Sequence, residues 1–230
     1  GTTPGAHGLR PPTPWPKSTC SDAHKASVHY SESLDGPWHN AGFVNVTGDR
    51  WTKWGDSNPA PLILDNGTVL MIGRTKDGAI LPNGTHVIYH NIWQYRANSW
   101  NDEYVWVPGT GVNGSLNIGN GKIPTEDPVL WKGRRGFHIF LHSGSLTTHA
   151  WSVDALEWHW SPDNAVNTTM VDKHSGDVVV LMDHERPRVA VNDEGDVTHF
   201  FMASEVDGSR NDAACTLSFA VKGTNTSQLL

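Results

Sequence analysis

The stretch EDPVLWKGRRGFHIFLHS, residues 126–143, decides the fold that we predict for this chain. Two adjacent carboxylates precede a proline, and apolar runs then flank a glycine-containing turn, as in a two-stranded hairpin. The same frame recurs in SNPAPLILDNGTVLMIG (57–73) and in ERPRVAVNDEGDVTHFFMAS (185–204). In all three copies a glycine follows the proline by eight residues, in the pairs Pro59 and Gly67, Pro128 and Gly136, and Pro187 and Gly195. A spacing that is constant over three copies indicates a structural repeat.

The repeat units predict an all-β fold. Short alternating strands between glycine turns, in units of about 60–70 residues that start near residues 58, 127 and 186, are typical of a β-propeller of four-stranded antiparallel blades. We expect a propeller domain over residues 20–230, preceded by an extended, proline-rich arm over residues 1–19. A half-blade over residues 24–47 brings the total to three and a half. Such a ring does not close, so unrecognised strands, a longer product or other chains would have to complete it.

The composition excludes two classes of partner. The chain has 24 Asp and Glu residues against 17 Lys and Arg residues, and it has no basic cluster. Nucleic acid and anionic membrane surfaces therefore have no electrostatic support as partners. The longest apolar runs fall far short of the roughly 18–20 residues that cross a bilayer, so no membrane span is predicted.

Two features predict an extracellular, secreted or cell-surface location. Asn-x-Ser/Thr sequons, the acceptor sites of N-glycosylation, occur six times, at Asn45, Asn66, Asn83, Asn113, Asn167 and Asn225. Asn-Gly turns that carry no glycan are the alternative interpretation. The two cysteines, Cys20 and Cys215, lie near opposite ends of the chain. In an exported protein they predict a disulfide bond, with two buried free thiols as the alternative.

The hairpin starts NPAPLILDNG, EDPVLWKGRRG and ERPRVAVNDEG, with the turns SESLDGPW and SVDALEW, resemble the five-bladed β-propeller glycoside hydrolases of family 43. Relatives in families 32, 62, 68 and 117 share this resemblance, which covers roughly residues 24–220. It implies hydrolysis of O-glycosidic bonds in a poly- or oligosaccharide by an Asp base, an Asp that tunes the acid, and a Glu acid. Asp127 matches the tuning Asp, and Glu185 matches the general acid. Such chemistry needs one carboxyl group protonated and another ionised.

The chain departs from the family at the position of the general base. The family base opens the first blade, but the N-terminal arm contains no Asp or Glu before Asp22. Asn58 is the nearest substitute and cannot accept a proton at neutral pH, which leaves Asp56 as the candidate base. The alternative function is therefore a non-catalytic secreted glycoprotein that uses its propeller for glycan binding or structural assembly.

Further side chains are candidates for contact with carbohydrate at the starts of the strands. Trp54 would stack on a sugar ring, and the histidines would donate or accept hydrogen bonds or hold a water at a central ion. The full set is Asn58, Glu126, Trp54, His142, His184 and Arg186. Structural alternatives remain, because Asp127 could cap a turn and Glu185 could form an ion pair with Arg186 or Arg188.

No metal site and no cofactor are predicted, although a central structural ion such as calcium is an alternative. The pairs His86 and His90, and His138 and His142, have a spacing that would suit zinc on a helix. In a strand, however, the two imidazoles of each pair would lie about 13 Å apart.

Overall fold

The structure is a computed structural model that describes residues 26–46, 58–80, 86–111, 115–118, 125–144, 146–161, 163–166, 169–172, 174–206 and 214–221. Throughout these ranges the regular elements are β-strands. No helix that is long and apolar enough to cross a membrane occurs in this part of the chain.

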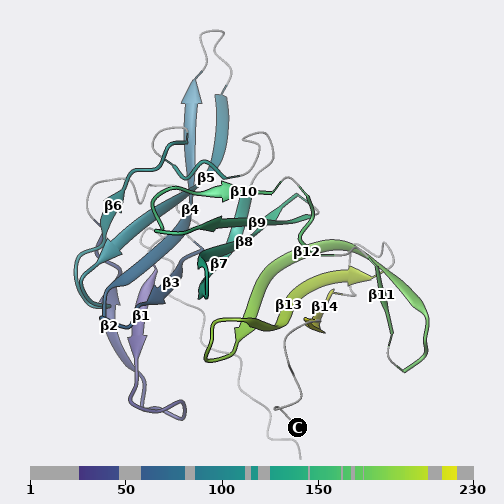
Figure 1. Cartoon of the computed structure of the whole chain (residues 1–230). Coiled ribbons are helices and arrows are strands. Elements are labelled where there is room, and N and C mark those ends of the chain that lie inside the picture. The colour runs from purple at the N-terminus through teal and green to yellow at the C-terminus, as the bar shows by residue number, and fades with distance from the viewer. Residues whose placement is uncertain are drawn as a thin grey trace, which may run out of the picture.

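Three four-stranded antiparallel sheets and one two-stranded sheet make up the fold (Figure 1). Sheet one contains β3 (Ala60–Ile63), β4 (Val69–Ile80), β5 (His86–Ala97) and β6 (Val105–Val107). Sheet two contains β7 (Thr125–Gly133), β8 (Gly136–Ser143), β9 (Leu146–Ser152) and β10 (His159–Trp160). Sheet three contains β11 (Thr169–Val171), β12 (Val178–Val191), β13 (Val197–Val206) and β14 (Ala214–Ala220). The two-stranded sheet contains β1 (Ser27–Tyr30) and β2 (His39–Phe43).

The predicted hairpins are confirmed, and the repeated glycine has a positive φ angle in each. Gly67, Gly136 and Gly195 all have positive φ angles, of 83°, 133° and 82°. Side chains rarely adopt such angles, which explains why glycine recurs at this spacing. At Gly195 space is restricted as well, because a Cβ atom there would lie 2.6 Å from the carbonyl oxygen of Lys132 in the neighbouring hairpin.

The sheets are arranged as the blades of a propeller, which confirms the predicted fold class. In sheets one and two the strands follow one another outward in chain order, and the first strands β3 and β7 contact each other. β7 also contacts β12 of sheet three. In Figure 1 sheet two lies between the other two four-stranded sheets.

Sheet three differs from the other blades in the source of its fourth strand. β11 comes before β12 in the chain and pairs with residues 178–180 at its beginning, while β13 pairs with the rest of β12. The fourth strand of this sheet, β11, therefore pairs with β12 at the edge opposite β13, rather than following β13 and β14 in chain order. The predicted half-blade is confirmed as β1 and β2, which are largely exposed. A groove of about 540 Å³ between this small sheet and sheet one is lined by Tyr30, Trp38 and Ile63, among others.

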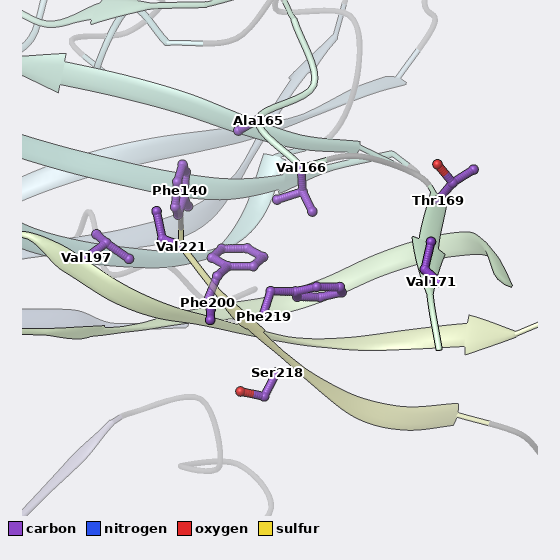
Figure 2. A pocket seen from close by; sticks show the side chains of 11 residues that line it. Phe140, Ala165, Val166, Thr169, Val171, Val197, Phe200, Ser218, Phe219 and Val221 are labelled. Carbon is purple, nitrogen blue, oxygen red and sulfur yellow. The ribbon is translucent and has the colours of Figure 1, made fainter. Parts of the chain in front are cut away.

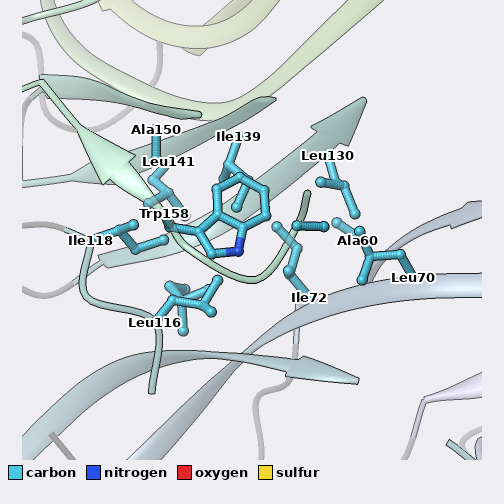
Figure 3. Packing of buried hydrophobic residues seen from close by; sticks show 12 residues of the cluster. Ala60, Leu70, Ile72, Leu116, Ile118, Leu130, Ile139, Leu141, Ala150 and Trp158 are labelled. Atoms are coloured by element: carbon cyan, nitrogen blue, oxygen red, sulfur yellow. The ribbon is translucent and has the colours of Figure 1, made fainter. Parts of the chain in front are cut away.

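An aliphatic core joins sheets one and two. Trp158 lies at its centre (Figure 3), among buried side chains from both sheets that include Leu70, Ile72, Leu130, Ile139 and Leu141. The Trp158 indole Nε1 donates a hydrogen bond of 2.9 Å to Gln94 Oε1, and Gln94 Nε2 donates one of 2.6 Å to the carbonyl oxygen of Ala155. Both ends of a fully buried amide are thus satisfied across the junction.

The junction of sheets two and three is aromatic instead. Trp131, His138, Trp151 and His159 form a row across all four strands of sheet two. In the next row Phe140 meets Phe200 of sheet three edge to face, with ring centroids 5.1 Å apart. These two phenylalanines line an apolar cavity of about 620 Å³ (Figure 2). At the hairpin turns, ion pairs join Lys132 to Asp65 of sheet one and Arg134 to Asp196 of sheet three.

Two histidines share a hydrogen bond inside this aromatic face. His138 Nδ1 and His149 Nε2 lie 3.1 Å apart, and their rings are stacked at 9° to one another. Burial and the neighbouring His138 lower the pKa of His149 from 6.5 to about 4, and burial and Arg135 lower the pKa of His138. The charged form of the pair is therefore disfavoured in the folded state.

The pair predicts a loss of stability in acid. His149 binds a proton more readily in the unfolded chain than in the folded protein. Its contribution to the free energy of unfolding should therefore be fully present above pH 6.5 and should be lost as the pH falls to about 4. Urea unfolding across this window should show the wild type losing about 1–2 kcal/mol more than His149→Phe, once solvent screening is allowed for. His159→Phe, at an exposed position of the same face, should keep the wild-type pH dependence; equal slopes for all three proteins would contradict the assignment.

Candidate functional site

The residue that precedes the inner-strand proline has a left-handed backbone in all three sheets. Asn58, Asp127 and Arg186 have φ angles of 30°, 50° and 52°. In sheet two Glu126 pairs with His142 and Val129 with Phe140, so that Asp127 and Pro128 together face Leu141. Sheet three repeats this arrangement, with Arg186 and Pro187 facing Met202. Two residues opposite one define a β-bulge. The inner strands of sheets two and three therefore share the same kink.

The kink is strained at each position. A residue before proline is restricted to extended conformations, and a left-handed conformation for a residue with a side chain costs of order 1–3 kcal/mol. Such conformations persist where the surrounding structure fixes them, and they are common in binding sites and active sites. The kink turns the side chains at the strand starts away from the regular alternation of a strand.

At sheet two these side chains form a contact network that we call the strand-start site: Asn58, Arg74, Glu126, Asp127 and His142. Asn58 Nδ2 donates a hydrogen bond to Asp127 Oδ1, and Arg74 forms an ion pair with Glu126 Oε2. His142 Nδ1 lies 3.7 Å from Glu126 Oε1 and 3.9 Å from Asp127 Oδ2. One oxygen of each carboxylate is therefore held by a donor, and the other faces the imidazole.

The strand-start site is only partly open to solvent. Arg74 is buried, with 3% of its side chain exposed, whereas 16% of Asp127 and 31% of Glu126 are exposed. Charge interactions are stronger in such surroundings than at a fully hydrated surface. The site therefore consists of a buried cation, Arg74, and a half-buried amide, Asn58, that hold two partly exposed carboxylates.

The kink within β12 of sheet three carries a separate pair. Glu185 Oε2 lies 3.0 Å from Arg186 Nη1, and both side chains are exposed. The ion pair between Glu185 and Arg186, which was the structural alternative for Glu185, is therefore present. His184, one residue earlier, is fully buried. By strand register Glu185 is the counterpart of Glu126, and Arg186 is the counterpart of Asp127.

The structure thus brings Asn58, Glu126, Asp127 and His142 together, and it places Glu185, Arg186 and His184 at the adjacent blade. Asp56, Trp54, Cys20 and the sequons at Asn83, Asn113, Asn167 and Asn225 lie outside the described residues. Cys215 lies in β14, and its side chain is not among those described. Asn45 and Asn66 are exposed.

Arg74 is the functional residue that sequence reasoning missed. By register it is the sheet-one counterpart of His142, because Ala60 pairs with Ile72 as Val129 pairs with Phe140. A polar residue directly after the apolar run of a second strand is a signal that could have identified it, since His142 follows its own apolar run in the same way.

No family model and no curated protein matches the sequence. Solved structures similar to this one include the GH32 β-fructofuranosidase of Bombyx mori in complex with sucrose, at 12% identity and a TM-score of 0.46. Another is the GH93 α-L-arabinofuranosidase of Fusarium graminearum with arabinobiose, at 16% identity and a TM-score of 0.46. A third represents the GH130 family of mannoside phosphorylases, with glycoside hydrolases that target β-1,2 mannosidic linkages in Candida mannan, at 12% identity and a TM-score of 0.36.

These alignments cover 80%, 81% and 72% of this chain but 36%, 51% and 49% of the respective structures. The chain therefore spans about a third to a half of the length of the proteins that it resembles. All three carry glycoside hydrolase family numbers. Family 32 is among the families named from the hairpin motifs, and family 43 is not represented among these three.

The strained kink predicts that glycine is preferred at Arg186. Arg186→Gly should raise the free energy of unfolding by about 0.5–1 kcal/mol, because glycine adopts positive φ without strain and the lost ion pair is exposed. Arg188→Gly, two residues along the same strand at an exposed position, should lower it by a similar amount. Chemical denaturation of the two variants measures the difference, and a destabilised Arg186→Gly would contradict the assigned strain.

Proposed function

We propose that this chain is a carbohydrate-active propeller protein that binds glycan at the starts of its inner strands. The observation that carries the proposal is the strand-start site, in which donors fix one oxygen of Glu126 and of Asp127 and leave the other available. Sugars are recognised by a few polar groups held in position, often charged ones, and a rigid kink supplies such positioning. The resemblance of the hairpin motifs to propeller glycoside hydrolases supports the same class of ligand.

Binding without hydrolysis fits the described side chains best. Hydrolysis requires two carboxyl groups about 5–10 Å apart on opposite sides of the scissile bond. At the strand starts, Asn58 and Arg74 engage Asp127 and Glu126, and Arg186 engages Glu185. Among the described residues, the group beside Asp127 is the amide of Asn58, which cannot accept a proton at neutral pH.

Hydrolysis is the second candidate function. One observation favours it: Asp127 and Glu185 stand just before the prolines of consecutive inner strands, β7 and β12, as the resemblance implies for a tuning carboxylate and a general acid. Asp56 would then supply the base.

A glycan panel separates the two candidates. Oligosaccharides that bind in calorimetry should be recovered intact, and Asp127→Asn should weaken binding about tenfold by removing a charge-assisted hydrogen bond. Release of reducing sugar that disappears in both Glu185→Gln and Asp56→Asn would instead establish hydrolysis. If no glycan on the panel binds and none is cleaved, the proposed function is wrong.

We infer further that the protein is exported and glycosylated. Six sequons and two widely separated cysteines support this, and Asn66 is exposed at the tip of the β3–β4 hairpin. Protein from a eukaryotic secretory host should lose mass on treatment with an N-glycosidase, and Asn66→Gln should remove one glycan from the intact mass. Unchanged masses would contradict glycosylation at this turn, and Asp65→Asn, which keeps the sequon, serves as the control.

A further inference from the structure

Among the described residues, the sheet of β1 and β2 corresponds to the outer half of a blade. Its counterpart in sheet two is the pair β9 and β10, because Tyr30 pairs with His39 across the turn as Trp151 pairs with His159. Trp38, directly before the first of these histidines, is 57% exposed, whereas its counterpart in sheet two is 7% exposed. β1 has no buried residue, whereas four of the seven residues of β9 are buried. The same strands are thus covered in sheet two and open in the small sheet.

The groove beside the small sheet lies where the inner strands of such a blade would be. In sheet two β9 pairs with β8, and β7 follows β8, whereas β1 pairs with β2 alone in the part of the chain that the structure describes. Inner strands of neighbouring blades contact each other, as β3 contacts β7. The groove of about 540 Å³ is lined by Val28 and Tyr30 of β1 and by Pro61 and Ile63 of β3. The repeat therefore predicts its occupant, which is a pair of antiparallel strands.

One hairpin of this chain extends beyond its own sheet. β4 and β5 stay paired as far as Ile80 and His86, whereas β3 pairs with β4 only up to Ile72 and β6 pairs with β5 only from Gln94. We call the outer part of this hairpin the projecting hairpin: residues 75–80 and 86–91. Each of its strands is longer than β1, which has four residues. Two strands alone are marginally stable in water, and open strand edges pair readily with other strands.

The projecting hairpin and the small sheet each supply what the other requires. Together they have four strands, the number in each of the other three sheets. In Figure 1 the projecting hairpin stands out at the top of the molecule, and β1 and β2 lie at the lower left. The two segments of one copy are therefore far apart, so a contact between them has to form between two copies.

We propose that two copies of this chain form a dimer by exchanging their projecting hairpins. The hairpin of each copy lies in the groove of the other copy and pairs with β1, which completes a four-stranded blade by addition of strands to a sheet edge. The exchange covers Tyr30 and Ile63, which are 44% and 61% exposed in a single copy. A two-fold axis makes the two contacts identical and closes the assembly at two copies.

Two variants test the two sides of the contact by sedimentation velocity over a concentration series, in which the wild type should be a monomer–dimer equilibrium. Replacing residues 76–90 by Asn-Gly joins the paired residues Thr75 and Asn91 through a two-residue turn and removes the projecting hairpin. This variant should raise the Kd of the dimer at least about a hundredfold, because both contacts are lost together.

Ile63→Lys changes the wall of the groove. It should raise the Kd at least about tenfold, because the dimer would bury the new charge. Val105→Lys is the matched control, since Val105 is 52% exposed on β6 of the same sheet and does not line the groove. It should keep the Kd of the wild type. Thermal melting establishes that each variant is folded.

Hydrogen exchange of the wild-type protein locates the contact without any substitution. When dilution dissociates the dimer, the amides of β1 and of the projecting hairpin should lose protection together. The amides of β8 and β9, in the centre of sheet two, should exchange at the same rates in both states.

Four results would overturn the proposal. The first is a protein that stays monomeric at every concentration, and the second is a dimer whose dissociation leaves exchange in β1 and in the projecting hairpin unchanged. The third is a dimer that Ile63→Lys weakens and the shortened hairpin does not, because another segment of the second copy would then occupy the groove. The fourth is growth beyond two copies, which would show an open-ended contact instead of a reciprocal exchange.

Discussion

The left-handed backbone before each inner-strand proline is the constraint on which the rest of the structure depends. Proline removes a hydrogen-bond donor and fixes its own φ, so the strand cannot continue in regular register through this point. A bulge absorbs the irregularity at Asp127 and again at Arg186, while Leu141 and Met202 opposite the two bulges remain buried. The kink therefore separates two parts of the inner strand in β7 and in β12. In β7 the part after the kink belongs to the apolar core, and the part before it carries the polar side chains of Thr125 and Glu126.

The two faces of sheet two show how one sheet can be joined to its neighbours by different chemistry. Toward sheet one it presents aliphatic side chains, together with a buried amide that is satisfied by Trp158 and Ala155. Toward sheet three it presents rings, two of which are imidazoles. The first junction has no group that titrates near neutral pH among these contacts, whereas the second includes His149, whose pKa burial and His138 lower.

The sequence predicts the repeat and the hairpins because both depend on local rules. A glycine at a fixed distance from a proline needs only the chain around it, and Gly67, Gly136 and Gly195 have the predicted turn geometry. The contacts of the strand-start site are different in kind. Arg74 reaches Glu126 and Asn58 reaches Asp127 only through the packing of one sheet on another, which no local spacing encodes. β11 was missed because it pairs with an extension of β12 that lies before the repeat frame.

The small sheet of β1 and β2 has a consequence for how the protein behaves in solution. Two strands alone are marginally stable in water, and here Tyr30, Trp38 and Phe43 are largely exposed. Ile63 of sheet one adds to the same apolar wall, along a groove of about 540 Å³. An exposed strand edge beside apolar surface is a template for self-association. Among the described residues, the end of the molecule next to sheet one therefore combines a small two-stranded sheet with apolar surface, a combination that favours association as the protein concentration rises.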